Sequence, residues 1–230
     1  MTTDLINQRI RASESSGGIS SNAIYTMIDR IIVKRDLKGQ VLDYGSGVGH
    51  LTRRLLATNR FDRVASADIM KAPDDLAHIV HWLERDLNIT VPGYDEAFDI
   101  VISAEVIEHL ENPRFTMREI FRLLRPGGTA IITTPNNESW RSLVALLIRG
   151  HYAAFGTGSY PAHITALLRE DLKRICLEVG FSEPEFYFTD QGGIPGNPCL
   201  TWQKISLGLF RGLRFSDNFM TVANKPRVSE

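Results

Sequence analysis

The stretch Val41-Leu42-Asp43-Tyr44-Gly45-Ser46-Gly47-Val48-Gly49-His50 decides the fold that this chain is expected to adopt. It begins as a short apolar strand, continues with a glycine at every second position, and leads into leucines spaced along one face of a helix. Glycine adopts positive φ and has no Cβ, so these glycines allow a sharp turn and a close approach of the backbone to a ligand. The pattern predicts a strand, a turn and a helix beside a nucleotide-type cofactor.

The glycine spacing and the acidic residue before it indicate the kind of cofactor. The pattern G-x-G-x-G, with Asp43 two residues before the first glycine, differs from the G-x-G-x-x-G of pyrophosphate-binding dehydrogenases. An acidic residue within the turn suits a ligand without phosphates. The stretch resembles motif I of the class I S-adenosylmethionine-dependent methyltransferases, whose cofactor carries a sulfonium cation and an amino-acid group. The resemblance implies that the methionine part of the cofactor lies along this turn, with the following residues in contact: Asp43, Gly45, Ser46, Gly47 and Gly49.

Two further acidic residues follow predicted strands. The strand-like stretch 64–67 ends in Asp68, at about the separation where a doubly wound fold places the carboxylate that binds the ribose hydroxyls. Asp86 lies where the family has an acidic residue beside the adenine, and we expect it to bind the exocyclic amine. A solvated loop carboxylate is the alternative reading of Asp86. The cofactor set is completed by Ile69, Leu87 and Ala104.

The order of strands and helices predicts the whole architecture. Residues 98–103 and 124–134 have the pattern of the fourth strand and of the family's helix, turn and fifth strand, and residues 185–189 and 218–223 have that of two closing strands. We expect an α/β, Rossmann-like, seven-stranded class I methyltransferase sheet with helices on both faces and an antiparallel final strand. Residues 1–230 are expected to form a single domain, with residues 1–22 as a flexible N-terminal segment.

Composition narrows the function classes. With 26 basic and 27 acidic residues in 230, the net charge is −1, so no general field attracts the chain to nucleic acid. There is neither a signal-peptide core nor an apolar run of the ~20 residues that span a bilayer, and we expect a cytoplasmic protein. Cys176 lies on an apolar helical stripe and Cys199 in a Gly/Pro-rich loop, which argues against a disulfide framework.

Two segments exceed what the minimal fold needs. Residues 136–166 and 191–215 each contain apolar residues at helical spacing, with Ile205, Leu209 and Leu213 forming the second set. Both segments either cap the open end of the sheet or form an apolar lid over a lipidic or aromatic acceptor. The lid interpretation includes a peripheral contact with a membrane surface.

The residues after the fourth strand carry the expected chemistry. If they are helical, Glu105, Glu108 and His109 stand at i, i+3 and i+4 on one side. This Glu-x-x-Glu-His pattern resembles the metal ligands of the ubiquinone-biosynthesis O-methyltransferases and of the small-RNA 2′-O-methyltransferases, and His163 lies where the RNA enzymes add a further histidine. The resemblance implies a divalent cation, Mg²⁺ or another, on these four residues. Without a metal, His109 or His163 would act as general base, and Glu105 is a third catalytic candidate.

The combined prediction is S-adenosylmethionine-dependent methyl transfer to a small or lipid-linked acceptor, with oxygen as the favoured acceptor atom. The alternatives are a metal-dependent RNA 2′-O-methyltransferase, a catalytically silent cofactor-binding partner subunit and, weakest, a dehydrogenase. The RNA alternative lacks an obvious basic stripe in the sequence. The acceptor and the oligomeric state are left open.

Overall fold

A computed structural model describes residues 3–227 of the chain, and within that range the side chains of Thr3, Leu5, Ser15, Ser16, Pro198 and Cys199 lie outside what is described. Its centre is a seven-stranded sheet with the order β3-β2-β1-β4-β5-β9-β6. The strands run as follows: β1 Gly39–Tyr44, β2 Phe61–Asp68, β3 His81–Glu84, β4 Phe98–Ala104, β5 Leu124–Pro135, β6 Glu185–Phe188 and β9 Asn218–Asn224. Strands β1 to β5 pair in parallel, and β9 pairs antiparallel with both β5 and β6. The predicted sheet and its antiparallel last strand are confirmed.

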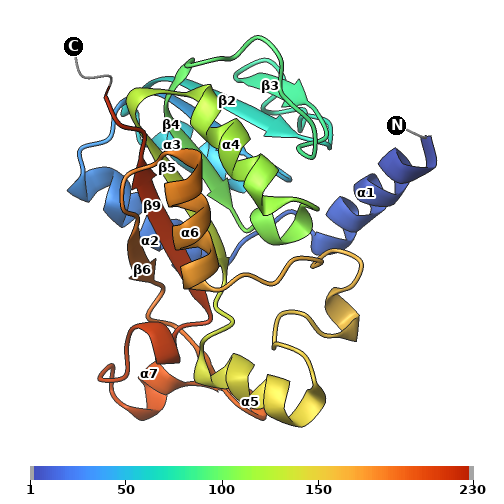
Figure 1. Cartoon of the computed structure of the whole chain (residues 1–230), viewed down its shortest axis with the longest axis vertical. Coiled ribbons are helices and arrows are strands. Elements are labelled where there is room, and N and C mark those ends of the chain that lie inside the picture. The colour runs from blue at the N-terminus through green and yellow to red at the C-terminus, as the bar shows by residue number, and fades with distance from the viewer. Residues whose placement is uncertain (1–2, 228–230) are drawn as a thin grey trace.

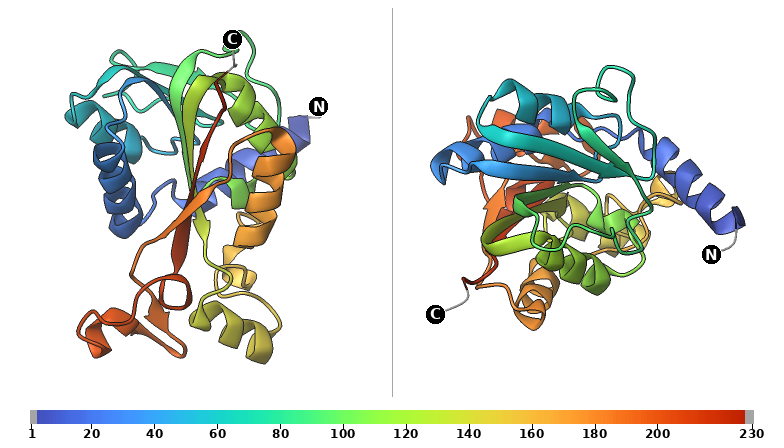
Figure 2. Two further views of the ribbon diagram at one scale, coloured as in Figure 1. Left: turned by 60° about the vertical axis from the view of Figure 1, so that its left-hand side comes forward. Right: turned by 90° about the horizontal axis from the view of Figure 1, so that it is seen from above.

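Helices cover both faces of this sheet, as Figure 2 shows. The long helices are α1 Thr3–Ser16, α2 Asn22–Lys34, α3 His50–Ala57, α4 Pro113–Leu123, α5 Trp140–Arg149 and α6 Arg169–Val179. Side chains alternate between the faces along each strand, so Val101 packs with α4 and α6 while Ile100 and Ile102 pack with α2 and α3. Two apolar layers therefore enclose the sheet, as expected for parallel strands that are buried on both faces.

The N-terminal segment differs from the prediction. Residues 3–16 form helix α1, where the sequence predicted a flexible segment over residues 1–22. The glycines of the low-complexity patch end this helix, because Gly17 and Gly18 both adopt positive φ, at 73° and 58°. Figure 1 shows α1 standing out from the sheet, toward the carboxyl ends of the parallel strands.

The two extra segments also differ from each other. Residues 136–166 contain the predicted helix as α5, followed by a 3₁₀ turn at Thr157–Ser159. Residues 191–215 do not form the predicted helix. They contain a hairpin of β7 Gly193–Ile194 and β8 Asn197–Thr201, the short helix α7 Trp202–Ile205 and a 3₁₀ turn at Leu213–Phe215. Positive φ at Leu207, Gly208 and Gly212 interrupts the helical path that the apolar spacing suggested.

Across residues 3–227, the helices are all too short or too polar to cross a bilayer.

Candidate functional site

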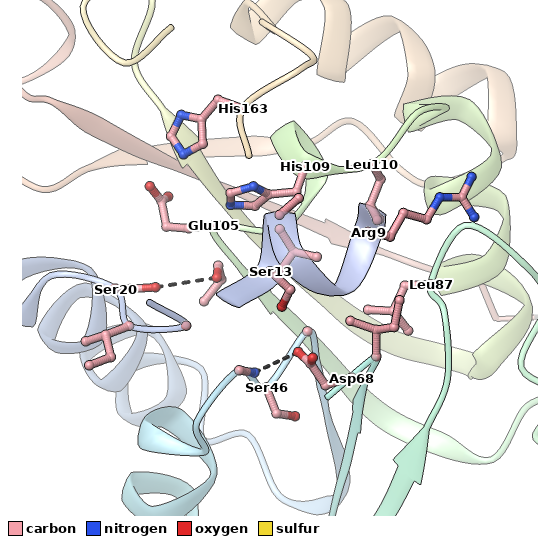
Figure 3. Close-up of a pocket in the computed structure, with 18 of the residues that line it drawn as sticks. Arg9, Ser13, Ser20, Ser46, Asp68, Leu87, Glu105, His109, Leu110 and His163 are labelled. Atoms are coloured by element: carbon pink, nitrogen blue, oxygen red, sulfur yellow. Dashed lines mark hydrogen bonds between the residues drawn. The ribbon is translucent and has the colours of Figure 1, made fainter. Parts of the chain in front are cut away.

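A cavity of about 520 Å³ opens where β1, β2 and β4 end (Figure 3). This is the carboxyl edge of the parallel strands, where open α/β sheets bind their ligands. Its wall contains nearly all of the residues predicted to bind the cofactor: Asp43, Gly45, Ser46, Gly47, Asp68, Ile69, Asp86, Leu87 and Ala104. Segments far apart in the sequence thus meet around one space of the size that holds a small organic ligand.

The glycine turn is built from close backbone contacts. A Cβ on Gly45 would lie 2.2 Å from the Cγ2 of Val106, and a Cβ on Gly47 would lie 2.5 Å from the carbonyl oxygen of Gly18. Gly49 begins helix α3 with φ of 79° and packs against Leu76, away from the cavity wall. The first two glycines therefore shape the cavity. Gly49 lies outside the cavity wall and starts helix α3, and its contact with the cofactor stays a prediction.

Asp43 presents a buried carboxylate to the cavity. Its Oδ2 accepts a hydrogen bond of 2.7 Å from the Thr52 hydroxyl, and its Oδ1 is buried with no hydrogen-bond partner among the described residues. Burial raises the pKa of this carboxyl to about 7. A buried carboxylate oxygen that accepts no hydrogen bond destabilises the folded state. The site therefore fits a ligand that brings a hydrogen-bond donor, such as an ammonium group.

Asp68 is the last residue of β2 and is also buried. Its Oδ2 accepts from the backbone N–H of Gly47 at 2.7 Å, and its Oδ1 accepts from that of Met70 at 2.9 Å. Burial raises its pKa, and the backbone N–H groups of Met70, Gly47 and Ile69 oppose this shift. Each carboxylate oxygen keeps a second lone pair, so Asp68 can hold the turn and still accept from a diol.

Asp86 lies after β3, at the far side of the same cavity. Its Oδ1 accepts from the backbone and side-chain nitrogens of Asn88, at 3.0 and 2.9 Å. Its Oδ2 is ion-paired with Arg9 of α1. The carboxylate is 8% exposed, so the alternative of a solvated loop residue is wrong.

The cavity also has a wall that the sequence did not predict. Helix α1 crosses the cavity, and its Arg9 and Ser13 are among the wall residues drawn in Figure 3. Further wall residues come from the loop before α2, from α2 itself, from the segment before α6 and from the start of β9: Ser20, Tyr25, Tyr160, Pro161, Ile164 and Asn218. Their sequence neighbourhoods hold no motif, because these contacts depend on segments far away in the chain.

The segment after β4 does not form the predicted helix. Glu105 has φ of 57°, and only Ile107–His109 form a 3₁₀ turn. Val106 packs over Gly45, and the Glu105 N–H donates to the backbone carbonyl of Thr133 on β5, which holds this residue outside a helix. The side chain of Glu105 accepts from the Thr133 hydroxyl at 2.9 Å and from the Asn218 amide at 2.7 Å. The predicted helix, which would align Glu105, Glu108 and His109 at i, i+3 and i+4, is therefore wrong.

Three of the four predicted metal ligands do converge. One ligand atom each of Glu108, His109 and His163 lies within 4.8 Å of the others. Glu108 Oε2 accepts from the Thr134 hydroxyl at 3.1 Å, while its buried Oε1 has no partner among the described residues. Glu105 is outside this group. Its carboxylate faces the cavity instead, where burial raises its pKa to about 7.

The two imidazoles are oriented by backbone carbonyls. His109 Nδ1 lies 2.8 Å from the carbonyl oxygen of Ala162, and His163 Nδ1 lies 2.7 Å from that of Ala154. Burial lowers the pKa of His109 to about 4 and also lowers the pKa of His163. Both rings are therefore neutral near pH 7, with Nδ1 as donor, so Nε2 carries the lone pair that can accept a proton or bind a metal. The rings meet edge to face, with centroids 4.8 Å apart.

Comparison with protein families and with curated proteins agrees with this geometry. Residues 21–182 match the family described as a methyltransferase domain. The ubiquinone biosynthesis O-methyltransferase of Pseudomonas fluorescens is 30% identical over 117 residues, which cover 47% of this chain and 49% of that protein. The malonyl-[acyl-carrier protein] O-methyltransferase of a Paenibacillus species is 24% identical over 201 residues, which cover 78% of this chain and 71% of that protein. The chain thus spans about half the length of the first of these relatives.

Solved structures share the fold at low sequence identity. A chain from the complex of the Haloferax volcanii Trm112 methyltransferase activator with a methyltransferase has a TM-score of 0.64 at 18% identity, with 96% of both chains covered. The 1,6-didemethyltoxoflavin-N1-methyltransferase of Burkholderia thailandensis, bound to S-adenosylhomocysteine, has a TM-score of 0.63 at 15% identity. The match covers 96% of this chain and 87% of that one.

The family match covers most of the chain, and the strand order, the glycine turn and the acidic residues at the ends of β1 and β2 all fit it. This assignment removes the dehydrogenase alternative. The chain belongs to the class I S-adenosylmethionine-dependent methyltransferases.

Proposed function

We propose that this protein transfers a methyl group from S-adenosylmethionine to an oxygen atom of a small or lipid-linked acceptor. The observation that carries the proposal is the pair of neutral imidazoles, His109 and His163, at one end of the cavity. Figure 3 places them away from Asp68 and Leu87, which line the opposite end. A hydroxyl acceptor must lose its proton during transfer, and a neutral imidazole is suited to take it.

In this proposal the cofactor spans the cavity from Asp43 to Asp86. The amino group of its methionine part approaches the unpartnered Oδ1 of Asp43, and the two ribose hydroxyls donate to Asp68. The adenine lies against Leu87, with its amine toward Asp86. These placements follow the order in which the three carboxylates line the cavity, and the buried oxygen of Asp43 gives the cofactor's ammonium group an acceptor.

The transfer step needs little covalent help from the protein. The acceptor oxygen attacks the methyl carbon, the carbon–sulfur bond breaks, and S-adenosylhomocysteine leaves while the hydroxyl proton moves to an imidazole Nε2. Because the sulfonium is already a good leaving group, the protein contributes mainly by holding oxygen, carbon and sulfur in line and by excluding water. Glu105 is held by Thr133 and Asn218 at the cavity wall, where it can orient the acceptor.

As an alternative to the general-base role, we propose that Glu108, His109 and His163 hold a divalent cation, in which case the imidazole Nε2 lone pairs bind the metal and do not take the proton. The fit rests on the unpartnered Glu108 Oε1 and on two imidazoles whose Nδ1 donates to a carbonyl, the arrangement that orients histidine ligands toward metals. A bound cation would lower the pKa of an acceptor hydroxyl. One carboxylate and two imidazoles suit a transition metal or Zn²⁺ better than Mg²⁺, which prefers oxygen ligands.

The test is the transfer of radiolabelled methyl from S-adenosylmethionine by the purified chain into an extract that is then separated into lipid, small-molecule, protein and RNA fractions. Label in the lipid or small-molecule fraction, in an ether or ester linkage, supports the proposal. Label confined to RNA would favour the 2′-O-methylation alternative. Absence of label in every fraction, from protein that binds S-adenosylhomocysteine, would favour the silent partner subunit.

A further inference from the structure

The two extra segments lie at one end of the molecule. Residues 136–166 leave the carboxyl end of β5, and residues 191–215 follow β6, which runs parallel to β5 because both strands pair antiparallel with β9. Figure 1 and the left view of Figure 2 both place α5 and α7 together at the end farthest from β3. We call α5 and residues 202–211 the apolar tip.

Among the side chains that the structure describes, the apolar tip carries the most exposed large aliphatic ones. Leu147 and Ile148, at the end of α5, are 85% and 77% exposed. Leu207 and Leu209, after α7, are 94% and 82% exposed. Single exposed leucines are ordinary on protein surfaces, but four at one end of the molecule, from two separate segments, mark a surface that is suited to apolar contact.

The backbone of the tip presents these side chains in a fixed arrangement. Positive φ at Leu207 and Gly208 forms the turn that carries Leu207 and Leu209. Beneath it, Phe210 stacks on Phe215 with centroids 4.7 Å apart, and Trp202 packs edge-on against Phe215 at 5.5 Å. The exposed leucines thus sit on a turn whose aromatic residues are packed, rather than on a segment that lacks local contacts.

The charge of the apolar tip has one sign. Residues 139–169 and 191–216 contain no Asp or Glu, although the whole chain has 27 acidic residues and a net charge of −1. The tip carries three exposed cations, Arg149, Lys204 and Arg211, for which the described residues supply no carboxylate partner. Exposed aliphatic side chains with unpaired cations between them complement the acyl chains and the anionic head groups of a bilayer.

We propose that the apolar tip docks on an anionic membrane surface. The four aliphatic side chains enter the boundary of head groups and acyl chains, and Arg149, Lys204 and Arg211 contact the anionic head groups. An RNA partner fits less well, since single-stranded bases bind on aromatic and guanidinium faces rather than on aliphatic side chains. The docking itself does not depend on the proposed function. One consequence rests on that function: a lipid-linked acceptor enters from the bilayer at the sheet edge where the cavity opens.

The test is flotation of the purified chain with vesicles of phosphatidylcholine alone and with vesicles that also contain phosphatidylglycerol. We expect retention by the anionic vesicles at low salt and its loss at high salt. Leu207→Asp with Leu209→Asp, and separately Leu147→Asp with Ile148→Asp, should each weaken the partition by more than about tenfold. The matched control is Val33→Asp with Ile79→Asp, which changes two exposed aliphatic residues outside the tip and should leave retention unchanged.

Three results would overturn the docking proposal: no retention of the wild type by anionic vesicles, equal retention of the tip and control variants, or an RNA complex that the tip variants lose while vesicles are not bound. A dimer in sedimentation that disappears in the tip variants would instead assign the tip to a second copy of the chain. Affinity for S-adenosylhomocysteine is measured in all variants. A variant that keeps its affinity for S-adenosylhomocysteine but no longer floats with vesicles has lost membrane docking alone. This outcome separates failure of the docking proposal from failure of the proposed function.

Discussion

Arg9 in helix α1 is ion-paired with the Oδ2 of Asp86, the oxygen that the proposed adenine amine would use. The other oxygen of Asp86 already accepts two hydrogen bonds from Asn88. A second Arg9 nitrogen donates to Glu111 at 2.6 Å, so the guanidinium ties α1 across the cavity at two points. Entry of the cofactor must therefore break or share the Arg9–Asp86 pair.

Arg9→Ala is expected to speed association of S-adenosylhomocysteine by about fivefold, since an ion pair of ~1 kcal/mol no longer has to be displaced. Stopped-flow fluorescence measures the association rate constant. Arg11→Ala is the matched control, because Arg11 is an exposed arginine of the same helix and does not line the cavity. An unchanged or slower association in Arg9→Ala would contradict the prediction.

Asp68→Ala should weaken binding of S-adenosylhomocysteine by more than tenfold, a loss of about 1.4 kcal/mol or more, because the ribose hydroxyls lose their acceptor. Isothermal titration calorimetry measures the affinity, and circular dichroism checks that the fold is intact. Asp75→Ala, which removes an exposed carboxylate that pairs with Arg53, is the control. Wild-type affinity in Asp68→Ala would show that the ribose lies elsewhere.

Asp43→Asn should make the cofactor-free protein more stable above neutral pH. Burial raises the pKa of Asp43 to about 7 from its ordinary value of 3.8, so the folded state keeps a proton that the unfolded chain releases between these pH values. The stability contributed by the wild-type carboxyl is therefore present below about pH 4 and is lost as the pH rises through about 7. The melting temperature of Asp43→Asn should exceed that of the wild type by more than about 3 °C at pH 8, with the gap closing toward pH 4.

The same substitution should weaken cofactor binding by more than about tenfold, because the ammonium group of the cofactor loses its anionic partner. Asp62→Asn is a control on β2, where the carboxylate is exposed. If Asp43→Asn lowers the melting temperature at pH 8, the buried carboxylate stabilises the empty site, and the argument from its unpartnered oxygen is wrong.

His163→Ala should weaken divalent-metal binding by more than about tenfold, since it removes one of three ligands. The measurement is a calorimetric titration of chelator-treated protein with Zn²⁺ and with Mn²⁺. His151→Ala is the control, because His151 belongs to the same segment but lies outside the ligand group. Full turnover in EDTA, with no metal found by elemental analysis, would contradict the metal proposal.

The cofactor half of the site was predictable because its signals are local. Gly45, Gly47 and Gly49 all adopt the positive φ that their residue type permits, and each acidic residue lies in a strand or in the loop after one. In contrast, Arg9 meets Asp86 across 77 residues and Asn218 meets Glu105 across 113. No spacing rule links such pairs, because they depend on the completed sheet.

The helix expected at Glu105 failed for a physical reason that can be named. The absence of a Cβ on Gly45 lets Val106 pack over the turn, and this contact, together with the bonds to Thr133, fixes Glu105 in a left-handed conformation that its residue type does not signal. The helix expected at 205–213 failed differently. Gly208 and Gly212 are helix breakers that the sequence shows, and their positive φ outweighs the apolar spacing that favours a helix.

The position of β9 has a consequence for how the chain folds during synthesis. β9 is the last strand in the chain, yet it lies between β5 and β6, and it brings Asn218 to Glu105. Until residues 218–224 have left the ribosome, β5 and β6 have no partner on the sides that face each other, and both keep an open edge. The nascent chain must therefore keep two open strand edges apart from other chains, and the cavity gains the wall that Asn218 supplies only when β9 inserts.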